Sequence, residues 1–336
     1  MRVSMYSEKK ILIIGGTGTI GRYLLEELLL YNPSVIRIFS RDEYKQFEMQ
    51  QEYSEYRNIR YLIGDVRDEK RLLRAMEDID YVFHLAAMKH VPSCEYNPFE
   101  AVQTNVIGTQ NVIQCALSAK VKKVLFTSTD KAISPTNTYG ATKLTAERLI
   151  SAADYQKGPK QTIFSSVRFG NVMGSRGSVI PLFKKQIMEK NVVTVTDKHM
   201  LRYMMTPSQA ISLMLEANEL ARGGEVFVLK MPIIRLSELV EVLVEQVTKK
   251  RAIQNPIKIK EIGLRPGEKM FEELMTEDEI RIALERENMY IILPSYAQNR
   301  RYRDANPIKE PPVVTEKLAI NKETLYDWFL NERLID

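Results

Sequence analysis

Short, unbroken apolar runs alternate with helical periodicity through the first half of the chain. Residues 11–14 are apolar throughout, as expected of a parallel strand covered on both faces. A glycine-rich turn follows, and then Leu24, Leu25, Leu28 and Leu29 share one face of a helix. Similar strand-like runs lie within residues 34–41, 58–68, 78–87, 121–130 and 161–172, with helical stretches at 67–77 and 98–119. This alternation predicts an α/β protein with a doubly wound parallel sheet.

The rhythm of the chain changes after Val172. Helices are expected within 177–190, 203–220 and 235–250, and strands within 224–231 and 256–263. We therefore expect a first domain over 8–172, to which 205–232 returns, and a smaller C-terminal α/β lobe with a tail, built from 173–204 and 233–336. The polar segment 296–312 contains three prolines and is expected on the surface.

Composition favours a globular protein of a reducing compartment. A length of 336 residues suits two lobes, and 44% hydrophobic with 27% charged residues is typical of soluble chains. The net charge of +5 is scattered, so no nucleic-acid surface is expected. Cys94 and Cys115 are the only cysteines, and no run of about 18 apolar residues occurs. These features predict a cytoplasmic protein that is not bound to a membrane.

Three histidines, His84, His90 and His199, show no metal-ligand spacing with a cysteine or an acidic cluster. We therefore expect no metal site and assign these side chains to packing or hydrogen bonding. His90 is the exception to watch, because it lies in a loop after a predicted strand.

A glycine turn joins the first strand to the first helix. Gly15, Gly18 and Gly21 give the spacing G-x-x-G-x-x-G. The first glycine permits a tight turn, the second lets the backbone approach a pyrophosphate, and the third lets the helix pack against the strand. The helix N-terminus offers N–H groups to the phosphate. In this strand–turn–helix context the pattern predicts a Rossmann-like, dinucleotide-binding domain, although a plain tight turn would share the spacing.

The ends of the next strands refine this prediction. Ser40 and Arg41 precede Asp42 after the second strand, and an arginine there accommodates the 2′-phosphate of NADP. We therefore expect NADP rather than NAD, while a solvated Arg41–Asp42 pair remains the alternative. Further contacts are expected at the ends of the third and fourth strands, from Asp65 and Val66 to the adenine and from Leu85, Ala86 and Ala87 beneath the cofactor.

Tyr139 and Lys143 are spaced one helical turn apart, on one face of the predicted helix. A tyrosine with a pKa of about 10 is a poor base at neutral pH. A neighbouring ammonium and an oxidised nicotinamide would favour the phenolate, which can remove a proton from an alcohol during hydride transfer. Together with the preceding strand and the glycine turn, this pair predicts an oxidoreductase-type active site.

Asp130 and Lys131 form a second pair, directly after the fifth strand. A surface ion pair of this kind would contribute roughly 0–1 kcal/mol. Its position at the carboxyl edge of the sheet, eight to nine residues before Tyr139, instead favours acid–base work on a substrate. A lysine base requires burial or nearby positive charge, for instance from Lys143, to lower its pKa of about 10.4 towards ~7–8. The aspartate must be protonated, or the pair must share one proton.

These motifs resemble those of the extended short-chain dehydrogenase/reductases. More narrowly, the chain is similar to the inverting UDP-N-acetylglucosamine 4,6-dehydratases of bacterial surface-sugar biosynthesis. The resemblance covers nearly the whole chain and rests on GGTGTIG, FSRDE, GDVRD, AAMKHVPSCEYNPFEAVQTNVIGTQNV, STDKAISPTNTYGATKL, RFGNVMGSRGSVIPLF and RPGEKMFEEL. Related hexose dehydratases usually carry Asp-Glu where this chain has Asp130-Lys131.

The resemblance implies a redox-neutral cycle on a tightly bound NADP. Tyr139 removes the C4 hydroxyl proton as C4 is oxidised, and Thr129 bonds the C4 oxygen. Lys131 then takes the C5 proton while Asp130 protonates the departing C6 hydroxyl. Hydride returns to C6 and a proton to C5, and the motifs leave open from which face that proton arrives.

The resemblance also implies the binding residues and the assembly. It makes 8–172 the NADP-binding domain and the smaller lobe the UDP-sugar-binding part, in a homo-oligomer that is a hexamer or a dimer. The expected cofactor contacts are Gly15, Thr17, Gly18, Thr19, Ile20, Gly21, Ser40, Arg41, Asp65, Val66, Leu85, Ala86, Ala87, Tyr139 and Lys143. The expected substrate contacts are Lys89, Asn171, Arg202, Arg265 and Glu268.

Two other functions fit parts of this pattern. A UDP-sugar C4 epimerase or ketoreductase of the same fold would use Tyr139 and Lys143 alone, because neither reaction breaks the C5–H or C6–O bond. A non-catalytic NADP-binding sensor would need neither pair. The presence of Asp130-Lys131 argues against the first, and the intact Thr129, Tyr139 and Lys143 argue against the second.

Overall fold

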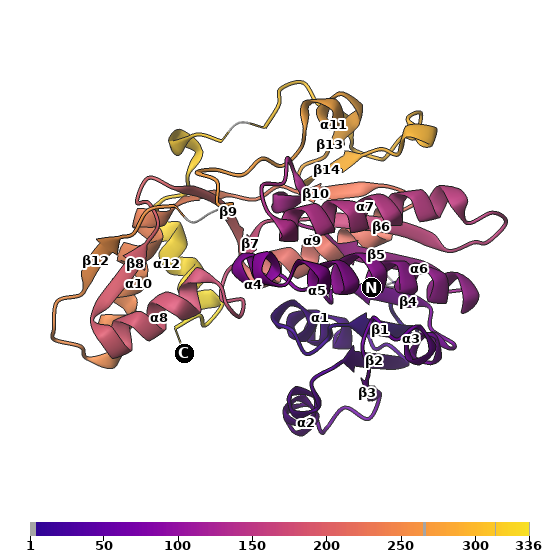
Figure 1. Cartoon of the computed structure of the whole chain (residues 1–336), viewed down its shortest axis with the longest axis horizontal. Helices are drawn as coiled ribbons and strands as arrows, with labels where there is room; N and C mark the ends of the chain where they lie inside the picture. The colour runs from indigo at the N-terminus through magenta and orange to yellow at the C-terminus, as the bar shows by residue number, and fades with distance from the viewer. Residues whose placement is uncertain (1–4, 265–266, 313, 336) are drawn as a thin grey trace.

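The computed structural model describes residues 5–264, 267–312 and 314–335, and its main feature is a ten-stranded sheet (Figure 1). Its parallel part runs in the order β3-β2-β1-β4-β5-β6-β10. The bounds are β1 Lys10–Ile14, β2 Val35–Ser40, β3 Ile59–Ile63, β4 Tyr81–His84, β5 Lys123–Thr127, β6 Ile163–Arg168 and β10 Val226–Leu229. The expected doubly wound Rossmann-like sheet is thus confirmed.

Helices cover both faces of this sheet because alternate residues of each strand point to opposite sides. In β1, Ile11 and Ile13 join a core with α1 (Thr19–Leu29), α2 (Glu43–Glu52) and α9 (Pro207–Leu220). Leu12 and Ile14 join the opposite core, with α3 (Glu69–Met76), α6 (Gly108–Ser118) and α7 (Thr138–Gln156). The strand order reverses between β1 and β4, and ligands of such sheets bind outside the carboxyl ends at that point.

The far edge of the sheet differs from the expected division of the chain. Beyond β10 lie three antiparallel strands, β14 (Met289–Ile292), β13 (Ala283–Glu285) and β15 (Asn306–Pro307). The segment 205–232 does return to the main sheet through α9 and β10. However, residues 283–307, expected in the smaller lobe, extend the main sheet as well. Short connecting helices here are α11 (Glu277–Ile282) and η3 (Ser295–Ala297).

The smaller lobe has its own core, set beside the main sheet (Figure 1). It contains α8 (Val179–Lys190), α10 (Leu236–Arg251), α12 (Lys322–Asn331) and η4 (Glu316–Leu318). Its strands form two small sheets, β8 (Val192–Val195) with β12 (Lys258–Glu261), and β9 (Leu201–Met205) between β7 (Asn171–Val172) and β11 (Ile233–Arg235).

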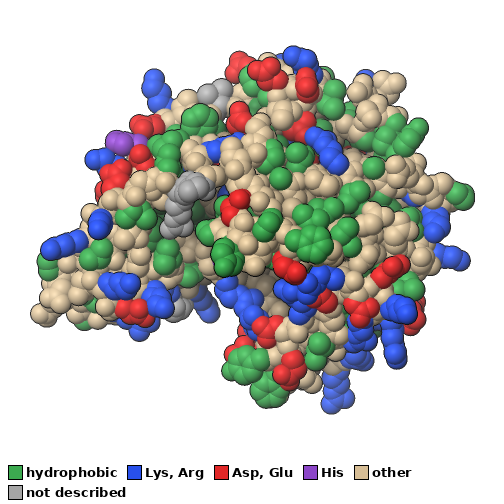
Figure 2. Space-filling view, viewed as in Figure 1, with side chains coloured by type: hydrophobic (Ala, Val, Ile, Leu, Met, Phe, Trp, Pro, Cys, Tyr) green, Lys and Arg blue, Asp and Glu red, His purple; other side chains and the backbone are tan. Residues whose placement is uncertain are grey.

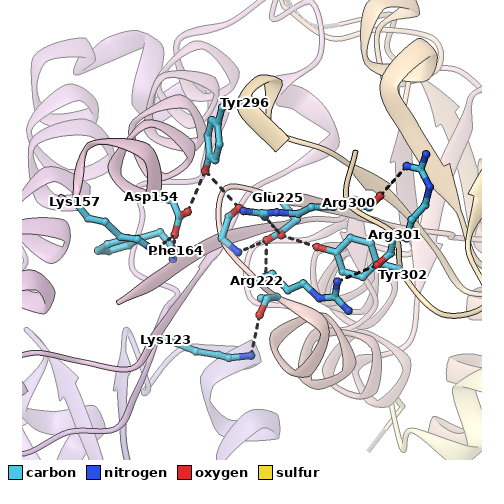
Figure 3. Close-up of polar contacts among 12 residues, drawn as sticks. Lys123, Asp154, Lys157, Phe164, Arg222, Glu225, Tyr296, Arg300, Arg301 and Tyr302 are labelled. Atoms are coloured by element: carbon cyan, nitrogen blue, oxygen red, sulfur yellow. Dashed lines mark hydrogen bonds and ion pairs between the residues drawn. The ribbon is translucent and has the colours of Figure 1, made fainter. Parts of the chain in front are cut away.

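The segment after β14 is anchored more firmly than its composition predicts. Tyr302 is buried and donates to Glu225 Oε1 over 2.6 Å, and Arg300 pairs with the same carboxylate. Tyr296 donates to Asp154 Oδ2 over 3.0 Å. Figure 3 shows the side chains of this segment pointing toward Glu225, just before β10, and Asp154. The segment 296–312 therefore lies mainly on the surface, as expected, and Tyr302 is its exception: this side chain is buried because the buried Glu225 carboxylate needs its donor.

Candidate active site

A groove of about 940 Å³ runs along the carboxyl edge of the parallel strands, over the glycine turn. Gly15 has φ +84°, and a Cβ built on it would lie 2.8 Å from the Ala86 backbone nitrogen. Helix α1 starts at this turn, and its N-cap, Gly18, contributes no side-chain hydrogen bond. The N–H groups of the first turn therefore face the groove, and this cradle fits the pyrophosphate of a dinucleotide.

Most expected cofactor contacts are brought together in this groove. The residues that line it include Gly15, Thr17, Gly18, Thr19, Ile20, Gly21, Ser40, Arg41, Asp65, Val66, Leu85, Ala86 and Ala87. Tyr139 and Lys143 instead line an adjoining cavity of about 250 Å³, which also reaches Ile20, Leu85 and Ala87. The groove and the cavity adjoin each other at these shared residues. A dinucleotide could therefore lie along the groove with its nicotinamide in the smaller cavity.

The end of β2 presents an arginine and no free carboxylate. Asp42 caps α2 by accepting from the Lys45 backbone nitrogen over 3.0 Å, and it also pairs with the Lys45 ammonium. These bonds hold the pKa of the Asp42 carboxyl below its usual range. Arg41 lies 3.6 Å from Asp65 with its guanidinium more than half exposed. Of these two side chains, Arg41 is therefore the more available to a ligand, because Asp42 is engaged in capping.

Asp130 and Lys131 lie side by side in the short 3₁₀ turn η2 (Asp130–Ala132) that follows β5. Lys131 Nζ lies 3.0 Å from Asp130 Oδ1, and the Thr129 hydroxyl donates to the same oxygen over 3.0 Å. The Asp130 side chain is fully buried, and its Oδ2 has no hydrogen-bond partner among the residues that the structure describes. The pair is thus shielded, with one carboxylate oxygen left for a further partner.

Gly170 leaves room for this carboxylate. A Cβ built on it would lie 2.6 Å from Asp130 Oδ2. Gly170→Ala should therefore displace the carboxylate and lower kcat about 10- to 100-fold, because small misplacements of reacting groups cost that much. Steady-state kinetics with UDP-N-acetylglucosamine measure this. Gly158→Ala, whose added methyl meets nothing within 4 Å but whose φ of +63° strains the backbone, is the control for a general loss of stability. An unchanged kcat in folded Gly170→Ala would show that Asp130 does not need its position.

The ionisation of Lys131 differs from the sequence-based expectation of a lowered pKa. Burial acts to lower it, but the charges of Asp130 and Glu272 outweigh burial and raise the pKa of Lys131. Glu272 is itself buried, and burial raises its pKa despite the nearby Lys131. The chain alone therefore favours the ammonium form of Lys131, which lies 3.0 Å from Asp130 and can share a proton with it.

Tyr139 is surrounded by groups with opposing effects. Burial raises the pKa of its phenol above the usual value, although Lys131 and a hydrogen bond with Thr129 act to lower it, so the chain alone does not favour the phenolate expected from the sequence. The expected partner, Lys143, instead donates from Nζ to the Thr127 carbonyl over 2.5 Å and lies 4.0 Å from the centre of the Phe126 ring. Of the two lysines in the cavity, Lys131 is thus the one that favours the phenolate in this structure.

Lys143→Met should remove a pH dependence of stability. Burial lowers the pKa of Lys143 to about 7, whereas an unfolded lysine titrates near about 10.4. Between these values only the unfolded chain binds the extra proton, so this lysine makes the free energy of unfolding rise with pH. Urea unfolding of cofactor-free protein at about pH 7 and about pH 9.5 should show the advantage of Lys143→Met shrinking as pH rises. A constant difference would contradict a lowered pKa.

The expected substrate residues face a cleft of about 730 Å³ between the lobes, lined among others by Lys89, Lys131, Asn171, Arg202 and Glu268. Figure 2 shows a hollow below α4 (Val91–Tyr96), with Lys and Arg side chains along its margin. Arg202 is largely engaged by the chain itself, because its guanidinium donates to the carbonyls of Lys269 and Met270 over 2.7 and 2.8 Å. It therefore shapes the loop around Glu268. Arg265 lies outside the described residues.

Two residues of the site escaped prediction. Glu272 lines the cleft and acts on the charge of Lys131. Asn105 lies in a π-helical turn, η1 (Gln103–Ile107), between α5 (Pro98–Val102) and α6. Its side chain accepts from the Met88 backbone nitrogen over 2.8 Å and donates to the Met88 carbonyl over 2.9 Å. It also donates to the Thr142 hydroxyl of α7 over 3.0 Å. A π-helical turn often marks a functional site, but its register shift leaves no periodicity to read.

The histidines take three different places. Burial, and then Lys143, lower the pKa of His84 to about 3, and its Nε2 lies 3.0 Å from Thr109 Oγ1 in the core. His90 lines both the groove and the cleft. His199 is exposed. Within the described ranges, no three His, Cys, Asp or Glu side chains gather to hold a metal ion.

The chain matches the family described as polysaccharide biosynthesis protein over residues 11–294. It belongs to that family. The match confirms the resemblance to extended short-chain dehydrogenase/reductases, and the relatives below include inverting 4,6-dehydratases, as the motifs indicated.

Proteins similar to this chain carry different names. The inverting UDP-N-acetylglucosamine 4,6-dehydratase of Campylobacter jejuni is 44% identical over 293 residues, covering 87% of this chain and 84% of that protein. A UDP-glucose 4-epimerase of Rickettsia typhi is 41% identical over 280 residues, 82% of this chain and 80% of that protein. The X-ray structure of Pen from Bacillus thuringiensis is 57% identical, with a TM-score of 0.91 over 98% of this chain and 99% of that one.

None of the helices in the described part of the chain is long and apolar enough to cross a bilayer.

Proposed function

We propose that this protein is an NADP-dependent UDP-N-acetylglucosamine 4,6-dehydratase that forms a UDP-4-keto-6-deoxy-N-acetylhexosamine inverted at C5. The observation that carries this proposal is the shielded Asp130–Lys131 pair, 3.0 Å apart in the cavity region of Tyr139. An acid beside a base is what removal of water across C5 and C6 requires, and oxidation alone does not. The name of the Campylobacter relative supports both the substrate and the inversion.

Proton transfers can be assigned to residues of the chain. When bound, NADP supplies the hydride acceptor for C4 and the hydride donor for C6. Tyr139 takes the C4 hydroxyl proton, helped by Lys131 and Thr129. The resulting ketone acidifies the C5 hydrogen.

The Asp130–Lys131 pair then carries out elimination. The Lys131 ammonium first passes a proton to Asp130 along their 3.0 Å contact, which leaves an amine and a carboxylic acid. The amine takes the C5 proton as the acid protonates the departing C6 hydroxyl, which leaves as water. Both groups end in the ionisation that they had at the start, so the step is balanced. Asp130 Oδ2 is buried beside Gly170 and lacks a partner among the described residues, so this carboxylate can take up the proton without breaking another hydrogen bond at that oxygen.

Binding of the UDP-sugar is assigned to the cleft between the lobes. Lys89 and Asn171 line both the cavity and the cleft, so we place them at the sugar. Glu268 takes the uridine ribose and Arg265 the diphosphate. Arg202 acts by holding the loop that carries Glu268, in addition to its charge.

The protein is further proposed to work in the cytoplasm as a homo-oligomer. Both cysteines are buried and free, which suits a reducing compartment. Tyr96 and Phe99 are 88% and 67% exposed on α4 and α5, as expected of side chains that a second copy covers.

A UDP-sugar 4-epimerase is the second candidate, favoured by the name of the Rickettsia relative. Tyr139 and Lys143 would suffice for it. The two functions separate when purified protein is incubated with UDP-N-acetylglucosamine in deuterium oxide without added cofactor. Loss of one water with deuterium at C5 supports the dehydratase, and NMR of the product gives its configuration. A product of unchanged mass inverted at C4 supports the epimerase, and absence of turnover supports a sensor.

A further inference from the structure

A short loop of the smaller lobe reaches back to the glycine turn. This loop, residues 173–178, joins β7 to α8 and is called the strap below. Its Arg176 donates from Nη2 to the Thr17 carbonyl over 2.6 Å and from its backbone nitrogen to Thr19 Oγ1 over 3.1 Å. Ser175 and Arg176 therefore line the groove opposite residues some 157 positions earlier in the chain.

Two glycines let the strap lie flat against its neighbours. Gly174 and Gly177 have φ +69° and +74°, in the region that disfavours side chains. A Cβ on Gly174 would lie 2.7 Å from Leu334 Cδ2, and one on Gly177 would lie 2.0 Å from His90 Cε1. The strap is thus fixed at one end by the C-terminal helix region and at the other by the loop after β4.

The strap carries its charge to the phosphate end of the groove. A guanidinium has five N–H donors, and only the contact with Thr17 O engages those of Arg176 among the described residues. The remaining donors lie beside the turn where the pyrophosphate of a dinucleotide sits. The Arg176 charge also helps to lower the pKa of Asp42, after the larger effect of Lys45.

We propose that Arg176 is a cofactor-binding residue, and that the strap closes the groove over the dinucleotide phosphates so that NADP is retained from one turnover to the next. The inference rests on the proposed function, whose redox-neutral cycle never requires cofactor exchange. Arginine suits the position because its planar fork binds phosphate oxygens in pairs.

The rate of NADPH release from the holoenzyme tests the proposal. Release is followed by stopped-flow fluorescence on mixing with excess NADP, without sugar nucleotide. Arg176→Ala should release NADPH about 10- to 100-fold faster, as expected for the loss of one or two charge-assisted hydrogen bonds. Arg176→Lys should give an intermediate rate. The matched control is Arg22→Ala. Arg22 lines a hollow that Arg176 also lines, but its charge is already paired with Glu52.

A second variant displaces the strap without changing the Arg176 side chain. Gly177→Ala should also speed release, because the added methyl collides with the His90 ring. Unchanged release in both Arg176→Ala and Gly177→Ala would overturn the proposal, as would an equal acceleration in Arg22→Ala. Because the release assay contains no sugar nucleotide, it tests the strap separately from the dehydratase function. Faster release in these variants, together with no dehydration by the unmodified protein in the deuterium oxide assay, would refute the dehydratase function and leave the role of the strap in place.

Discussion

Lys131→Met should lower the rate of dehydration of UDP-N-acetylglucosamine by about a thousandfold, the typical contribution of a positioned acid or base. Methionine keeps the length of the side chain but has no proton to exchange. Asp130, fully buried, would lose the cation 3.0 Å away and could no longer be recharged with a proton from it. Asp130→Asn should therefore be about as damaging, and the double variant hardly worse, because the two groups act as a unit.

Mass spectrometry of the sugar nucleotide and NMR of C5 deuterium in deuterium oxide measure this effect. Lys122→Met is the control, because Lys122 is an exposed lysine paired with Asp80 on the surface. Thermal unfolding and NADP content show that each variant is folded and loaded. If Lys131→Met dehydrates at the rate of the unmodified protein, the elimination assigned to the pair is wrong. If it instead retains a full rate of C4 epimerisation, the second candidate function is favoured.

Arg168→Met should lower the free energy of unfolding by about 3–5 kcal/mol, the usual cost of removing one partner from a buried ion pair. Arg168 is fully buried in β6, and its guanidinium donates to Glu147 of α7 over 2.6 Å. It also bonds Glu279 over 2.9 Å and the Leu274 carbonyl over 2.9 Å. The variant would leave the buried Glu147 without its ion-pair partner and Glu279 with only the exposed Arg148, at the point where the segment carrying Glu272 meets α7.

Denaturant unfolding of the unmodified protein and of Arg168→Met gives the difference in their free energies of unfolding. Arg148→Met is the matched control: Arg148 also pairs with Glu279, at 3.3 Å, but is 59% exposed, so its loss should cost below about 1 kcal/mol. Despite burial, Arg168 lowers the pKa of Glu279, so this contribution is present above the unfolded pKa and is lost as pH falls through the folded one. The gap between wild type and Arg168→Met should narrow on acidification, and a gap below 1 kcal/mol at neutral pH would contradict the assigned role.

The sequence predicted what depends on near neighbours in the chain. Apolar runs and helical spacing gave the alternation of strands and helices because both periods are local. The glycine turn, the Asp130–Lys131 pair and the Tyr139–Lys143 pair each lie within one turn, so their proximity follows from a few backbone angles. The carboxyl edge of a parallel sheet then brings consecutive strand ends together, which placed Ser40, Asp65 and Leu85 in one groove.

Only the tertiary structure decided which distant segments meet. The pKa of Lys131 depends on Glu272, and the strap contacts a turn some 157 positions earlier in the chain. Arg168 bonds one carboxylate 21 positions before it and another 111 positions after it. Strands β13–β15 extend the main sheet although their residues follow the smaller lobe in the chain. The hydrophobic periodicity of the sequence does not predict these long-range contacts, because they depend on burial and charge compensation over the whole fold. The sequence by itself therefore determined the elements and the candidate reacting groups, and the packing of remote segments determined the ionisation and the burial of those groups.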